Sequence, residues 1–120
     1  MRMSFFRAAV LAGFAVAGMS GAAPAFAEGA IAHGNDGHVG MSWGLRHREA
    51  EERALRECGG RSCEIVGRFE RQCAAIAVGR RGAYGWAVHA RPNQAENDAV
   101  RQCQRHDGID CVVVLHGCDA

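Results

Sequence analysis

A nine-residue segment occurs twice in this chain, and each copy ends on a cysteine. AEERALREC covers residues 50–58, and AENDAVRQC covers residues 95–103. The similarity extends beyond these segments, because at an offset of 45 residues 12 of the 29 positions from 30 to 58 are identical without a gap. Chance alone would give about one or two identities, so the sequence indicates an internal duplication.

Each unit reads as two strands, a helix and a third strand. Large and small residues alternate over 39–45 and over 84–90, which is typical of strands, and a glycine-bearing turn precedes each segment. Ala50, Ala54 and Cys58 recur at helical spacing. We therefore expect an α+β fold, a duplicated β-β-α-β unit with about six mostly antiparallel strands and two helices on one face, stapled by disulfides.

The alternation also predicts two different sheet faces. We expect the large side chains, Trp43 and Trp86 among them, to pack under the helices as core. The opposite face would carry small residues and would be bare or covered by a partner, including a second copy of the chain. This candidate interaction face consists of Gly40, Ser42, Gly44, Gly85, Ala87 and His89.

The first 27 residues have the organisation of a secretory signal peptide. Arg2 and Arg7 precede an apolar run, and Ala25-Phe26-Ala27 forms an A-x-A cleavage site. The alternative, a retained membrane anchor, requires about 20 apolar residues, and glycines interrupt this run. We expect cleavage before Glu28 and a secreted or periplasmic single domain over 28–120, with repeat one at about 29–69 and repeat two at about 73–118.

Six cysteines lie in the mature part and have neither C-x₂-C metal spacing nor a C-x-x-C redox motif. In a short exported domain this predicts three disulfides. The simplest pairing is local in each repeat, Cys58 with Cys63 and Cys103 with Cys111, which leaves Cys73 for Cys118. The chief alternative joins each helix cysteine to the cysteine after the final strand of its repeat.

These motifs together resemble an exported bacterial family known as domain of unknown function 4189. The most specific part is the paired A-x-x-x-A-[LV]-x-x-C motif at residues 50–58 and 95–103, and the resemblance extends from about Gly29 to Cys118. It implies secretion and a disulfide-stapled α+β domain. It implies no established activity.

Few residues are candidates for metal binding or catalysis. His33, Asp36 and His38 flank the first turn and are candidate ligands for Zn²⁺ or Cu²⁺, although the second repeat has Val78 and Ala83 in the places of the histidines. Glu51 and Glu96 occupy equivalent positions and are candidates for a hydrolase-like carboxylate pair. Neither Ser42 nor Ser62 lies in a nucleophile motif, so we assign no catalytic residue.

The mature chain is also nearly neutral, with 12 arginines against 13 acidic residues after Arg2 and Arg7 are removed. This balance argues against a nucleic-acid or anionic-membrane partner. We therefore expect a non-enzymatic interaction domain, without a cofactor, that binds a protein or a cell-envelope component. The alternatives are a small hydrolase of envelope polymers and a metal-binding accessory protein that uses His33 and His38.

Overall fold

The two halves of the chain have the same order of elements. In this computed structural model residues 28–119 are described, and the expected signal peptide at 1–27 lies outside them. The first half contains β1 (Glu28–His33), β2 (Val39–Leu45), α3 (His47–Cys58) and β3 (Glu64–Glu70). The second contains β4 (Cys73–Val78), the short 3-10 turn η1 (Arg80–Gly82), β5 (Tyr84–His89), α4 (Pro92–Arg105) and β6 (Val112–Cys118).

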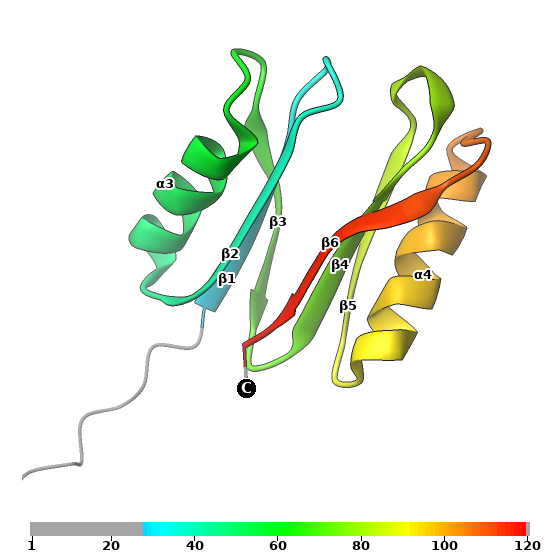
Figure 1. Cartoon of the computed structure of the whole chain (residues 1–120). Coiled ribbons are helices and arrows are strands. Elements are labelled where there is room, and N and C mark those ends of the chain that lie inside the picture. The colour runs from blue at the N-terminus through cyan, green and yellow to red at the C-terminus, as the bar shows by residue number, and fades with distance from the viewer. Residues whose placement is uncertain (1–27, 120) are drawn as a thin grey trace, which may run out of the picture.

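Each half forms its own three-stranded antiparallel sheet, in the order β2-β1-β3 and β5-β4-β6. Figure 1 shows the sheets face to face, with α3 outside the first and α4 outside the second. The α+β class, the six antiparallel strands and the two helices are confirmed. The placement of both helices on one face is wrong, because each helix covers the outer face of its own sheet.

Small residues form the contact between each helix and its sheet. In the first half Ala30 and Ala32 pack against Ala50 and Ala54, and all four are buried. In the second half the corresponding contact joins Ala75, Ala77, Ala95 and Ala99. Small side chains on both sides allow the helix backbone to lie close to the strands, so the stripe of alanines on each helix determines which sheet face it covers.

Large residues instead fill the space between the sheets. Ile31, Met41, Phe69 and Ile76 are buried there together. The expectation that large side chains pack under the helices is therefore reversed. The two halves bury their bulky faces against each other, which explains why one unit alone would leave its apolar face exposed.

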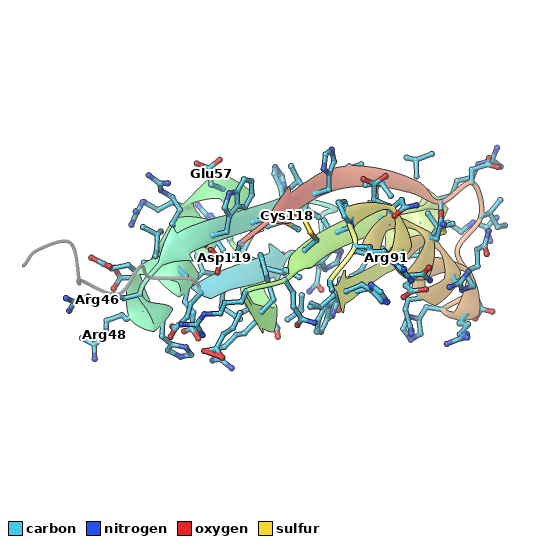
Figure 2. All side chains as sticks on the ribbon, turned by 90° about the horizontal axis from the view of Figure 1, so that it is seen from below. Arg46, Arg48, Glu57, Arg91, Cys118 and Asp119 are labelled. Carbon is cyan, nitrogen blue, oxygen red and sulfur yellow. A yellow bond between two sulfur atoms is a disulfide. The ribbon has the colours of Figure 1, made fainter. Side chains whose placement is uncertain are left out.

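All six cysteines are paired as the local scheme predicts, Cys58–Cys63, Cys103–Cys111 and Cys73–Cys118. The first two bonds join the end of a helix to the start of the following strand region. The third joins directly opposed residues of β4 and β6, and Figure 2 shows it at Cys118. Within residues 28–119 no helix is long and apolar enough to cross a membrane.

Candidate functional site

The small-residue face that the sequence suggested as an interaction surface is covered by the protein's own helices. A Cβ on Gly85 would lie 2.2 Å from the backbone nitrogen of Cys103, and one on Gly40 would lie 2.1 Å from the carbonyl oxygen of Ala54. The hydroxyl of Ser42 is buried and donates a hydrogen bond to the carbonyl of Ala50.

The other three members of the predicted interaction face have different surroundings. Ala87 packs against the α4 core. Gly44 lies in open space at the end of β2 with φ +77°, and the His89 ring accepts a hydrogen bond from the Arg91 backbone. These residues do not form one exposed surface, and the prediction of an interaction face here is wrong.

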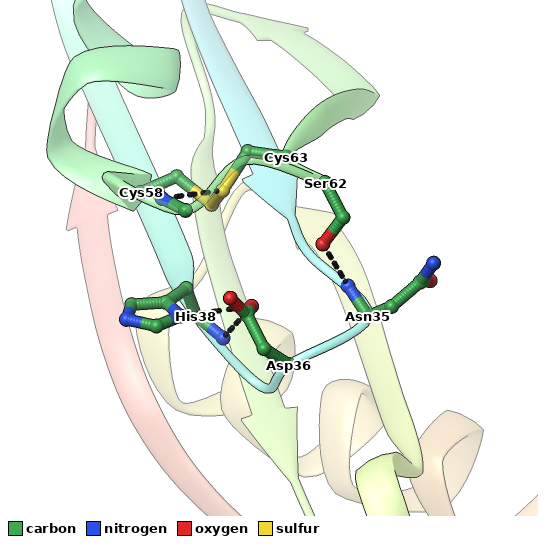
Figure 3. The surroundings of a disulfide bond; sticks show 7 residues. Asn35, Asp36, His38, Cys58, Ser62 and Cys63 are labelled. Carbon is green, nitrogen blue, oxygen red and sulfur yellow. Dashed lines mark hydrogen bonds and ion pairs between the residues drawn. A yellow bond between two sulfur atoms is a disulfide. The ribbon is translucent and has the colours of Figure 1, made fainter.

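The candidate metal ligands are not brought together. His38 contacts the Asp36 carboxylate at 2.8 Å in the first turn, beside the Cys58–Cys63 bond (Figure 3). His33 instead points between the sheets and stacks on Tyr84. Residues 28–119 contain no group of three or more His, Cys, Asp or Glu side chains able to hold a metal ion.

The candidate carboxylate pair is also separated. Glu51 lies on α3 and interacts with Arg68 and His47. Glu96 lies on α4, 3.8 Å from His116. Because the two helices cover opposite outer faces (Figure 1), these carboxylates cannot act on one bond.

A groove of about 840 Å³ lies along the edge strand β5. Its lining comes from the β5 strand, the preceding turn and the end of α4, and it comprises Arg80, Arg81, Gly82, Ala83, Tyr84, Gly85, Trp86, Gln102, His106 and Asp107. This volume lies within the range of about 300–1,000 Å³ that is usual for ligand-binding pockets. Of these residues, only Gly85 belongs to the interaction face that the sequence predicted.

The β5 edge presents backbone groups to this groove. The Gly79 N–H bonds the Ala83 carbonyl, so alternation in the antiparallel ladder directs the backbone groups of Tyr84, Trp86 and Val88 away from β4. The Tyr84 carbonyl lies 3.3 Å from His106 Nδ1. Trp86 and Val88 have no further backbone partner among residues 28–119, so the edge can accept another strand.

The turn before β5 carries two adjacent arginines with different roles. Arg80 forms an ion pair with Asp110 at 2.6 Å. Arg81 has positive φ (+63°), a conformation that is uncommon for a side chain other than glycine. Within residues 28–119 its guanidinium has no ion pair or hydrogen bond. Arg81 therefore offers an unneutralised charge where the groove meets the turn.

A smaller hollow of about 370 Å³ adjoins the same turn and is lined by His33, Glu64, Tyr84 and Arg81 among others. His33 is only 8% exposed, and its Nε2 has no hydrogen-bond partner. Burial lowers the pKa of the His33 imidazole, although the nearby carboxylates of Asp36 and Glu64 act in the opposite direction. At neutral pH the ring is therefore uncharged.

The two halves have the same order of elements, so these residues can be compared between them. His33 corresponds to Val78, Tyr84 to Val39, and Glu64 to Val112. Valine occupies the same places in the other half of the molecule, so the fold does not require polar groups there. Comparing the two repeats position by position could have found this polar cluster from the sequence, because the residues that differ in polarity are those that gather beside the β5 turn.

The model of a protein family described as a domain of unknown function (DUF4189) matches residues 29–118 of the chain. The chain belongs to this family. The match to the DUF4189 model therefore includes both halves of the fold and all three disulfides. It agrees with the similarity of the paired cysteine motifs to this family.

Relatives of this DUF4189 chain occur in mycobacteria. Uncharacterized proteins of Mycobacterium tuberculosis and Mycobacterium bovis are 37% identical over 82 residues, which is 68% of this chain. The chain spans 56% of the length of these relatives. The NMR structure of Rv1813c from Mycobacterium tuberculosis aligns with a TM-score of 0.60 and 29% identity, over 98% of this chain and 91% of that chain.

Proposed function

We propose that this chain is exported and that its mature domain is a non-enzymatic binding module, which takes an extended segment of a protein partner along β5. The observation that carries the proposal is the groove of about 840 Å³ beside an edge strand with unpaired backbone groups. Added strands gain affinity from main-chain hydrogen bonds, whereas side-chain contacts in the groove give selectivity.

Two features support export. The n-region, apolar run and A-x-A site precede Glu28, the mature part carries three disulfides, and such bonds persist in oxidising compartments. Intact-mass measurement of the exported protein is expected to give a chain that begins at Glu28. A mass that includes Met1 or the apolar run would contradict export with cleavage.

The binding site can be tested at Val88, whose N–H points away from β4. Val88→Pro removes this donor but leaves the β4–β5 ladder intact, because proline is tolerated where its nitrogen faces away from the neighbouring strand. Val88→Ala loses similar side-chain packing and keeps the N–H, so it is the matched control.

We expect the mature domain and Val88→Ala to retain the same protein from a cell-envelope extract of the producing organism, and Val88→Pro to lose it. In the wild-type domain, amide exchange at Trp86 and Val88 should slow when that protein is bound. Retention by Val88→Pro at the wild-type level, or unchanged exchange at both amides, would contradict binding at this edge.

A further inference from the structure

An added strand could run in either direction along β5. An antiparallel partner is the more stable choice, and it would run from the His89 end of β5 toward Tyr84. Its carboxyl end would then arrive at the turn that carries Arg80 and Arg81. A parallel strand would instead bring its amino end to the same cationic turn.

The turn is suited to a carboxylate. Arg80 is already engaged by Asp110, whereas Arg81 has no charged partner within residues 28–119. A free guanidinium can donate two parallel hydrogen bonds to a carboxylate. Asp107 also lines the groove, but Arg81 lies closer in sequence to the start of β5 and also lines the adjoining hollow beside Tyr84.

The other half of the molecule gives an internal contrast. At the edge strand β2 the position equivalent to Arg81 is Asp36. The Asp36 carboxylate is engaged by His38, and it would repel a carboxylate. The two edges therefore share a backbone arrangement but differ in the sign of the charge at the turn.

We propose that the occupant of the β5 groove is the carboxyl-terminal segment of a polypeptide, added antiparallel to β5 with its terminal carboxylate bound by Arg81. This inference rests on the function proposed above and specifies its ligand. Pairing at Tyr84 uses the carbonyl that His106 contacts, so the bound peptide lies beside the His106 ring.

The test uses two libraries of random heptapeptides, one displayed with free carboxyl termini and one with the carboxyl end tethered. We expect the mature domain to enrich sequences from the first library. An enriched peptide, synthesised as the free acid and as the amide, should bind about tenfold or more tightly as the acid, because charge-assisted hydrogen bonds are the stronger ones.

Arg81→Gln should remove the difference between acid and amide. Arg91→Gln is the matched control, because Arg91 follows the far end of β5 and has the same charge (Figure 2). The NMR signals of the His106 ring should shift on binding of the acid. Equal binding of acid and amide, or an acid preference that depends on Arg91 and not on Arg81, would overturn the proposal.

The variants at Val88 separate this inference from the proposed function. If Val88→Pro abolishes binding but acid and amide bind equally, edge binding stands and carboxylate recognition fails. If Val88→Pro binds these peptides as the wild type does, or if neither library is enriched, both proposals fail.

Discussion

The imidazole of His33 lies nearly parallel to the phenol ring of Tyr84, with ring centroids 3.6 Å apart and planes inclined by 14°. The two residues belong to different sheets, His33 to β1 and Tyr84 to β5. This stack therefore joins the two halves of the molecule beside the β5 turn, and it does so with a histidine that has no hydrogen bond at its buried Nε2.

We expect the stability of the domain to fall in mild acid because of His33. Burial lowers the pKa of this imidazole in the folded state below its usual value of 6.5. Above 6.5 the ring is neutral in both states. As the pH falls below 6.5, the unfolded chain takes up the proton first and is favoured, and the loss is complete below the folded-state pKa.

Urea unfolding between pH 8 and pH 5 measures this effect. His33→Val, which copies Val78 of the other half, should flatten this part of the pH dependence and leave the fold intact. His116→Val, which removes an exposed histidine, should retain the wild-type slope. A His33→Val slope equal to that of the wild type would contradict the assignment.

Gly85→Ala should destabilise the domain by pushing α4 away from its sheet. The new methyl group would lie 2.2 Å from the Cys103 nitrogen and 2.6 Å from the Ala99 carbonyl oxygen, both backbone atoms that cannot rotate away. Overpacking of this kind costs about 1–3 kcal/mol. The comparison is Gly44→Ala, which meets open space but has φ +77° and should cost about 1 kcal/mol. Thermal or urea unfolding in which Gly85→Ala is the milder change would argue against close helix–sheet contact.

The elements and the two local disulfides could be predicted from the sequence because their signals are local, and the third disulfide followed from the two cysteines that remained. The alternation of residues 39–45, the helical spacing of the alanines and the short separations between cysteines each report on a few neighbouring positions. The layer arrangement could not be read in this way. Alternation shows that a strand has two faces, but it does not say which of them a helix covers.

Which face of a sheet a helix covers depends on the sizes of the side chains that meet in the contact. A helix with Ala50 and Ala54 on its inner side can bring its backbone close to the strands only if the strand residues beneath are also small. The bulky residues on the other face of each sheet, such as Ile31 and Ile76, then pack against those of the other half. The groove along β5 was missed for a different reason, because an edge strand is defined by the neighbour that it lacks in the folded sheet.

Removal of the Trp86 side chain should weaken the contact between the sheets more than removal of Trp43. Trp86 packs in the layer between the sheets, and its indole lies against Gly67 of β3, where an added Cβ would be 2.6 Å from the ring. Trp43 lies against Gly117 but is 44% exposed. We expect a loss of about 3 kcal/mol for Trp86→Ala and about 1–2 kcal/mol for Trp43→Ala in urea unfolding. Equal losses would contradict the difference in burial.

Loss of the Cys73–Cys118 bond should cost more than loss of a local bond. It closes a loop with a sequence separation of 45, against 5 for Cys58–Cys63. On the chain-entropy model the long bond contributes about 4 kcal/mol and the short one about 2 kcal/mol. The double variants Cys73→Ala/Cys118→Ala and Cys58→Ala/Cys63→Ala avoid unpaired thiols and can be compared by thermal unfolding without reductant. The reverse order of stability would contradict the model.

The bond between Cys73 and Cys118 also encloses the whole second half, from the start of β4 to the end of β6, in one covalent ring. Exposed turns such as those at 79–83 and 106–111 are the places where proteases cut folded domains. A single cut inside the ring leaves the fragments joined, so the nicked chain migrates as one molecule until it is reduced. Cleavage at one turn would thus not release β5 from the rest of the domain.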